Sequence, residues 1–441
     1  MNNSISQEFN FISLIKFTIP SISMMIFTSL YGIVDGIFVS RFVSTQALSA
    51  FNIIYPFINV VIGIGVMLAT GASAIIAKKL GEKRDDEARR NFTFIVLVGS
   101  TIGIIMSLLG YIFLENMIYA LGSTQELYIY CEMYLKATFW FVPAYIVNLL
   151  YQFFTITAGK PKIGLTLTIL GGVSNIILDY IFIVPLDMGI SGAAIATGLG
   201  NLIPVILGTI YFMKFSKTLY FTKFSIDIKM FLETCKNGSS EMVSNLAAGI
   251  TTMLFNYAMI KYAGSDGVAA MSIVLYGQFL IIATYLGFTS GIAPILSYNY
   301  GEENYTQIKK LVGYAIKFLG ITSIVVYVLS IIGAPTILQV FTDKNSTVYE
   351  LGYRGFLIFG TSFLITSISI FISGMFTAFS NGKISAIISF FRTFIFIVAG
   401  VTIFPMIWGI DGVWISVPIA EALSAVIAII LFRKYRKTYQ Y

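Results

Sequence analysis

The side chains in this sequence that could do chemistry are a few acids inside long apolar stretches. Asp35 lies in LYGIVDGIFVS, residues 30–40, about five residues before the stretch ends. At 1.5 Å per residue its carboxylate would lie ~7 Å deep in a membrane-spanning helix. Burial there costs on the order of several kcal/mol unless the acid faces a cavity or partner, so such residues mark ion or substrate paths. The alternative is a position near the membrane interface.

Three more polar residues are placed to join Asp35. Asn175 and Asp179 are four residues apart and share one helical face, and Thr197 lies at a similar depth in the next stretch. We therefore expect Asp35, Asn175, Asp179 and Thr197 to form one site. Their oxygens suit Na⁺, or a proton shared by the two carboxylates. Structural hydrogen bonds between helices are the alternative.

The second half of the chain carries other charged candidates. Glu421 lies about ten residues from either end of the last apolar stretch, where it could bind an organic cation or pair with Arg392. Glu241 lies near the start of its stretch, where hydration at the interface is the alternative. Pro20 could act as a hinge, since proline removes a backbone hydrogen bond and clashes one turn back; a fixed kink would look the same.

Composition restricts the class of protein. The 441 residues are 57% hydrophobic and 11% charged, which predicts a polytopic membrane protein. There is no histidine, which opposes Ser-His-Asp and His-metal chemistry and hence a membrane enzyme. The net charge of +7 comes from short loops between apolar stretches, so it indicates topology and not nucleic-acid binding. Two cysteines, Cys131 and Cys235, imply no disulfide framework.

Twelve apolar stretches are long enough to span a bilayer. They lie near residues 12–39, 47–77, 92–114, 132–157, 163–185, 191–213, 232–260, 268–298, 312–333, 350–379, 384–406 and 411–432. Lys and Arg gather after every second stretch, so the positive-inside rule predicts cytoplasmic N- and C-termini. The first stretch has no small-residue cleavage site and is expected to be a retained helix.

The two halves of the chain repeat each other at a constant offset of 220 in the numbering, which we call the repeat offset. Gly81 pairs with Gly301, and GISGAAIA from Gly189 matches GIDGVWIS from Gly409. Six stretches precede the repeat, so we expect two six-helix lobes, residues 1–220 and 221–441, related by an axis along the membrane normal. The counterparts of Asp35 and Asp179 are Phe255 and, within a residue, Ala399. The acids are therefore not part of the repeated scaffold.

Several segments also resemble the multidrug and toxic compound extrusion (MATE) family, prokaryotic branch. They are LYGIVDGIFVSR, ALSAFNIIYPF, GASAIIAKKLGEK, ITAGKPKIG, NIILDYIF and MGISGAAIAT. The resemblance implies alternating access and export of cationic or amphipathic compounds, driven by inward Na⁺ or H⁺. It assigns the cation site to the positions matched here by Asp35, Asn175, Asp179, Thr197 and, less directly, Asn148. One departure is GSSE, residues 238–241, where many members have a proline.

The sequence thus predicts a monomeric secondary exporter in a bacterial cell membrane, with a coupling ion, a small organic substrate and no cofactor. A flippase for a lipid-linked oligosaccharide would need basic residues for a pyrophosphate, and Arg392 is the only clear mid-membrane cation. A receptor is opposed by the lack of a sizeable soluble domain. Asp35 and Asp179 should readily share a proton, whereas the neutral oxygens of Asn175 and Thr197 favour Na⁺. We expect the two ions to compete and Na⁺ to drive export.

Overall fold

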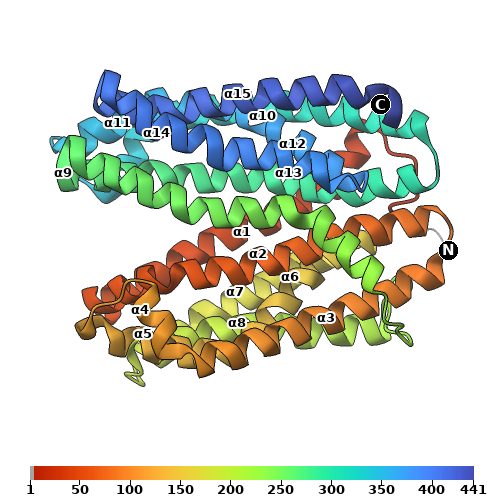
Figure 1. Cartoon of the computed structure of the whole chain (residues 1–441), viewed down its shortest axis with the longest axis horizontal. Helices are drawn as coiled ribbons and strands as arrows, with labels where there is room; N and C mark the ends of the chain where they lie inside the picture. The colour runs from red at the N-terminus through yellow and green to blue at the C-terminus, as the bar shows by residue number, and fades with distance from the viewer. Residues whose placement is uncertain (1–3) are drawn as a thin grey trace.

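The computed structural model describes residues 4–441 and consists of helices arranged in two bundles side by side (Figure 1). The first bundle contains α1 (Phe11–Phe42), α2 (Thr45–Gly81), α3 (Asp85–Ile112), α4 (Leu114–Ala120), α5 (Gln125–Phe139), α6 (Val142–Thr157), α7 (Pro161–Ile183) and α8 (Gly189–Lys214). The second contains α9 (Ile228–Gly301), α10 (Tyr305–Phe341), α11 (Thr347–Phe359), α12 (Phe363–Ala378), α13 (Gly382–Phe390), α14 (Phe396–Trp408) and α15 (Ile410–Tyr439).

The helix lengths account for the predicted spans. Within residues 4–441, ten helices are long and apolar enough to cross a membrane, and α5 with α6, bent by 57°, makes an eleventh. Helix α9 has 74 residues, with non-helical φ/ψ at Gly264. A straight helix of that length would measure ~111 Å, more than three times a ~30 Å hydrocarbon core, so α9 must supply two crossings. Divided in this way, each of the twelve predicted stretches has a helical counterpart.

Three of the crossings are interrupted where the sequence predicted plain stretches. Span four breaks before Pro143, which lies in the first turn of α6, where the missing backbone N–H of proline would have no partner within the helix anyway. The tenth contains a short 3₁₀ turn, Gly360–Ser362, between α11 and α12. The eleventh contains a π-helical segment, Phe391–Ile395, between α13 and α14.

The backbone repeats at the offset found in the sequence. Lys83 and Glu303, which the repeat offset relates, have φ of 62° and 58°, and Gly189 and Gly409 have φ of 56° and 58°. A Cβ at Gly81 would overlap the carbonyl oxygen of Tyr298, and one at Gly301 would overlap that of Lys78. The repeat offset relates Gly81 to Gly301 and Lys78 to Tyr298, so the two contacts are symmetry-related copies of each other. Helix α2 and the second crossing of α9 therefore meet backbone to backbone at these glycines.

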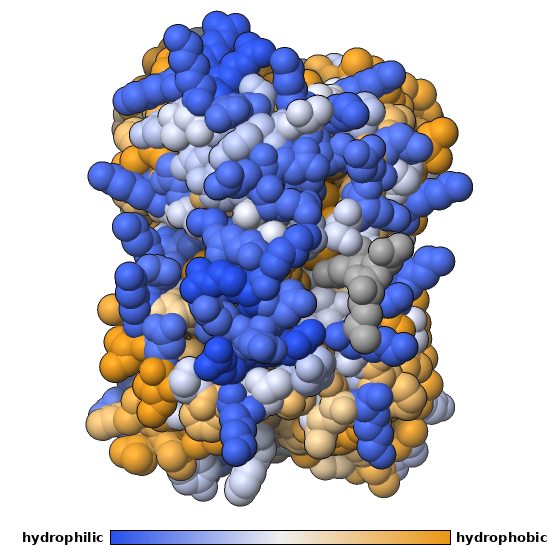
Figure 2. Space-filling model, turned by 90° about the vertical axis from the view of Figure 1, so that its right-hand side faces the viewer, coloured by the Kyte–Doolittle hydropathy of each residue, from blue (hydrophilic) through white to orange (hydrophobic). Residues whose placement is uncertain are grey.

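These glycines lie at the end of the molecule that carries both chain termini and the basic loops. Figure 2 shows this end covered by hydrophilic side chains, with apolar surface along its flanks. Lys83 joins the bundles there: its Nζ donates to Glu302 Oε1 at 2.7 Å and to Tyr298 Oη at 2.8 Å. Residues 215–227 connect the bundles and pack on α3, with Arg89 over the Tyr220 ring at 4.5 Å.

Candidate functional site

The first bundle brings the two predicted acids together. Asp35 on α1 is 9% exposed and Asp179 on α7 is 0% exposed. Their carboxyl groups face each other closely enough to interact, and Asp35 also faces Thr197. Asp35 Oδ1 and both Asp179 oxygens are buried without a hydrogen-bond partner in the described part of the chain. Two buried carboxyl groups thus lie next to each other with three of their four oxygens unpaired.

Amide and hydroxyl groups continue this site across α8. Asn175 Nδ2 lies 3.5 Å from Thr197 Oγ1, and Asn175 Oδ1 is buried and unpaired. Asn201 Nδ2 donates to the Thr197 carbonyl at 2.8 Å, and Asn148 Nδ2 donates to Asn201 Oδ1 at 2.9 Å. Asn148 therefore joins the site through Asn201; within residues 4–441 no hydrogen bond links it to either acid.

Glycines allow the three helices to approach so closely. A Cβ at Gly172 of α7 would lie 2.6 Å from Phe27 Cε1 and 2.9 Å from Tyr31 Cδ1 of α1. A Cβ at Gly171 would lie 2.6 Å from the Gly200 carbonyl oxygen of α8. Such distances are shorter than real Cβ contacts, so larger residues would push α7 away from its neighbours. Small residues at helix interfaces have this role in membranes.

Sequence reasoning missed two members of the site. Tyr134 of α5 is 4% exposed, and its hydroxyl lies close to Thr197 and within electrostatic range of Asp35 and Asp179. No local signal marked it among 26 tyrosines, because only the packing of α5 brings it to the acids. Asn201 did have a signal, since it lies four residues after Thr197 on the same face of α8.

The arrangement fits a small cation. Four buried, unpaired oxygens come from Asp35, Asp179 and Asn175, and the Thr197 hydroxyl is adjacent. A proton can bridge two carboxyl groups, and Na⁺ is a hard cation that takes oxygen ligands. Residues 4–441 contain no group of three His, Cys, Asp or Glu that could hold a metal ion.

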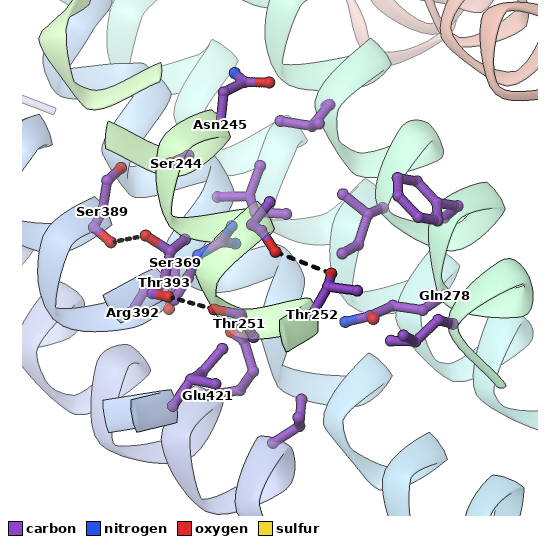
Figure 3. Close-up of a pocket in the computed structure, with 18 of the residues that line it drawn as sticks. Ser244, Asn245, Thr251, Thr252, Gln278, Ser369, Ser389, Arg392, Thr393 and Glu421 are labelled. Atoms are coloured by element: carbon purple, nitrogen blue, oxygen red, sulfur yellow. Dashed lines mark hydrogen bonds between the residues drawn. The ribbon is translucent and has the colours of Figure 1, made fainter. Parts of the chain in front are cut away.

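The second bundle contains a cavity of about 260 Å³ between α9, α12, α15 and the π-helical segment (Figure 3). Its wall is largely apolar, with Phe255, Phe279 and Ile282 of α9 among the lining side chains. Three charged groups also line it: Glu241, Arg392 and Glu421. Phe255 is the residue that the repeat offset pairs with Asp35, so the equivalent position is apolar.

Arg392 interacts electrostatically with both glutamates across the cavity and forms no ion pair within 4.0 Å with either, among the pairs the described residues make. Arg392 Nη1 and Glu421 Oε2 are buried without hydrogen-bond partners in this part of the structure. The structural pair considered for Glu421 is therefore an electrostatic contact and not a closed salt bridge. Arg392 belongs to the π-helical segment, and such segments often mark functional sites.

The structure also places the last two candidates from the sequence, Glu241 and Pro20. Helix α9 begins at Ile228, thirteen residues before Glu241, so this acid lies ~20 Å along the helix and on the cavity wall. Pro20 is buried inside α1, which continues unbroken through it. Beside it, a Cβ at Gly287 of α9 would lie 2.8 Å from the Ser21 carbonyl oxygen.

Comparisons with known proteins agree with this architecture. The multidrug export protein MepA of Staphylococcus aureus (strain bovine RF122 / ET3-1) is 26% identical over 439 residues, covering 96% of this chain and 93% of MepA. A MATE crystal structure in complex with MaL6 superposes with a TM-score of 0.94 at 21% identity, covering 100% of this chain and 99% of that one. An outward-facing multidrug resistance MATE transporter of the MOP superfamily gives 0.91 at 22%, covering 97% and 96%.

These likenesses show that the chain has the MATE fold and is a multi-pass membrane protein. The profile of the MatE family matches residues 20–181 and 241–403, together more than half of the chain. The starts of the two matched segments differ by nearly the repeat offset, so the family profile follows the internal repeat. The chain belongs to the MatE family of transporters, and not to an enzyme family.

Proposed function

We propose that this protein is a secondary exporter that uses an inward flow of Na⁺ or H⁺ to expel cationic or amphipathic organic compounds. The observation that carries the proposal is the buried pair Asp35 and Asp179, three of whose four carboxyl oxygens lack hydrogen-bond partners in the described structure. Two unbalanced acids at membrane depth are costly unless a cation neutralises them. The multidrug export proteins among the relatives support the proposed substrate class.

The ion would act by holding α1 against α7. Without a cation the two carboxylates repel each other, and with one bound the attraction favours the close helix packing that Gly172 permits. Binding then favours one arrangement of the first bundle over another. Antiport follows if the substrate prefers the opposite arrangement, because each ligand shifts the equilibrium by its difference in affinity for the two states.

The cavity of the second bundle is the proposed substrate site. An apolar wall with two carboxyl groups and one guanidinium suits an organic cation better than a pyrophosphate. The flippase alternative, which needs several basic residues, is therefore disfavoured. Asn175, Thr197, Asn148 and Asn201 would serve the ion, and Glu241, Arg392 and Glu421 the substrate.

Alternating access requires the contacts between the bundles to open. We assign the lobes to residues 1–220 and 221–441; the repeated backbone geometry and the two family-profile segments support this division. Pro20 is the proposed hinge of α1, because proline removes a backbone hydrogen bond there, directly before the contact of Ser21 with Gly287 and fifteen residues before Asp35. The basic loops support cytoplasmic termini in a bacterial cell membrane. One chain supplies both lobes, consistent with a monomer.

The coupling ion is tested in proteoliposomes. We expect Na⁺ and H⁺ to compete at one site, because both bind the same two carboxyl groups, and a Na⁺ gradient at clamped pH to drive substrate efflux. The reverse experiment clamps Na⁺ and imposes a pH gradient. Efflux that responds to pH alone, without competition from Na⁺, would leave a proton antiporter. Efflux that responds to neither ion would refute ion-coupled export.

A further inference from the structure

A second cavity, of about 400 Å³, opens between α10, α12 and α15. Its residues recur at helical spacing: Ile316, Leu319 and Gly320 on α10; Leu364, Ser367, Ile368, Phe371 and Ile372 on α12; Ile429, Phe432, Arg433 and Arg436 on α15. Helix α12 packs against both α10 and α15 and forms the floor. We call this cavity the α10–α15 groove.

The body of the groove presents hydrocarbon. Ser367 is its one polar side chain apart from the arginines, and its hydroxyl is already hydrogen-bonded to Ser323 at 2.8 Å. A Cβ at Gly320 would meet nothing within 4 Å, and the same holds for Gly313, two turns nearer the start of α10. These glycines leave the α10 wall open. A flexible apolar chain would fill such a space, whereas a polar ligand would find no partner in it.

One end of the groove is cationic. Arg433 and Arg436 lie one turn apart near the end of α15, and both are exposed. Neither forms an ion pair with an Asp or Glu side chain among the described residues; Arg436 Nε donates only to the Tyr441 backbone oxygen at 3.1 Å. Lys309 follows the same stripe of α10 as Gly313, Ile316 and Gly320 and is also exposed. Several donors thus remain free at one mouth of an apolar groove.

The geometry points to a binding site for one anionic phospholipid, with an acyl chain along the groove and the phosphate at Arg433 and Arg436. Guanidinium groups bind phosphate oxygens in bidentate fashion, and basic pockets between helices on the cytoplasmic side of a membrane suit anionic headgroups. The groove mouth lies near the C-terminus, at the hydrophilic end of the molecule (Figure 2). A negative headgroup therefore complements the local charge.

The site adjoins the proposed substrate cavity through α12. One face of this helix lines the groove with Phe371 and Ile372, and another lines the cavity with Ser369, Ile370 and Ser373. A bound lipid would thus pack directly against the wall of the cavity. Because the groove lies within the second bundle alone, it does not depend on the proposed ion site.

The test measures lipid binding to the purified full-length protein by native mass spectrometry. Phosphatidylglycerol and phosphatidylcholine with identical acyl chains are titrated separately, and glycerol phosphate is added as a competitor. We expect phosphatidylglycerol to bind about thirtyfold more tightly than phosphatidylcholine, on a basis of about 1 kcal/mol for each arginine near a membrane surface. Glycerol phosphate, which has no tail, should not compete at equal concentration.

One variant of the arginines and one of the groove wall locate the site, with a lysine variant as the control. Arg433→Gln with Arg436→Gln should abolish the preference, whereas Lys217→Gln with Lys223→Gln, which removes the same charge from the connecting segment, should retain it. Gly320→Phe fills the groove without changing charge and should weaken both lipids; it also tests the site if the arginine variant does not fold. Equal binding of both lipids, an unchanged preference in the arginine variant, or competition by glycerol phosphate would each overturn the proposal. Displacement by a transported organic cation would overturn it too, because the groove would then belong to the substrate path.

Discussion

At equivalent places the two lobes differ in how closely their helices approach. In the first, Gly172 lets α7 lie against Phe27 and Tyr31 of α1. In the second, the position paired with it, within one residue, is Arg392, in a π-helical segment beside an open cavity. The first lobe encloses two acids in a compact site, whereas the second surrounds a space of about 260 Å³.

The polar residues differ in the same way. The repeat offset pairs Asp35 with Phe255 and Asn201 with Glu421. The first lobe therefore holds its charges where α1 meets α7, and the second places an acid where the first has an amide. The comparison teaches that one repeated backbone can provide both a small oxygen-rich site and a roomy apolar one, because side-chain volume and charge at a few positions decide between them.

The largest effect should come from the acids of the first lobe. Asp179→Asn leaves Asp35 as the only carboxylate, so we expect Na⁺ affinity to fall at least about thirtyfold and ion-driven efflux to be lost. Sodium binding by calorimetry and efflux from proteoliposomes measure the two quantities. Asp187→Asn, an exposed acid in the following loop, is the control and should behave as wild type. Normal Na⁺ binding in Asp179→Asn would show that the acids of the first lobe do not bind the ion, and the contrast between the lobes would fail.

The next effect tests the symmetry of the contact between α2 and α9 at the hydrophilic end of the molecule. Gly81→Ala and Gly301→Ala each place a methyl group against a carbonyl of the other lobe, which disfavours the observed contact by about 1–3 kcal/mol. Both should shift the population toward an open end by about 5–150-fold. Spin labels at positions 86 and 306, which the repeat offset relates, report the separation. Gly320→Ala, whose Cβ meets nothing, should cause no shift. An effect of only one glycine would show that the lobes close asymmetrically.

A smaller effect is expected at the second lobe. Glu421→Gln removes one acid from the cavity, so the apparent affinity for an organic cation should fall about tenfold, as for one hydrogen bond to a charged group. Sodium affinity should stay within about twofold, since the proposed ion site lies in the other lobe. Substrate-dependent efflux and Na⁺ titration separate the two. Glu350→Gln, on the exposed surface of α11, is the matched control. A loss of Na⁺ affinity in Glu421→Gln would contradict the division of roles.

The smallest effect concerns the link between lobes. Hydrogen bonds with Glu302 and Tyr298 raise the pKa of Lys83. A raised pKa contributes stability below the ordinary lysine value of about 10.4, and this stability is lost as pH rises through the folded-state pKa. Because the pair is exposed, Lys83→Gln should cost at most about 1 kcal/mol, constant between about pH 6 and 9.

Thermal unfolding of wild type, Lys83→Gln and the control Lys223→Gln across this range checks the prediction. The symmetry-related pair would be Glu303 with Glu82, which cannot form a salt bridge. A difference that changed near neutral pH would show that another group titrates with Lys83. An equal loss in the control would show that the effect is one of net charge alone.

Much of the fold could be predicted because its signals are local or periodic. Apolar length identified each crossing, and the spacing of glycines revealed the repeat that the backbone follows at Lys83 and Glu303. The π-helical segment around Arg392 gave no such signal, because it depends on how α13 and α14 pack. The break before Pro143 was marked only by the proline itself, and the boundary between the predicted spans 232–260 and 268–298 falls at Gly264, where the backbone of α9 is non-helical.

For the candidate sites, the sequence alone determined which charged residues lie within apolar stretches and that the two aspartates belong to the first lobe, since burial of a charge is costly wherever the chain folds. It could place Asn175 beside Asp179 because helical periodicity fixes that spacing. Only the tertiary structure decided that Tyr134 joins the acids, that Asn148 reaches them through Asn201, and that Glu241 lines a cavity. These contacts join different helices, and their distances depend on the volume of every side chain between them, which no local pattern records.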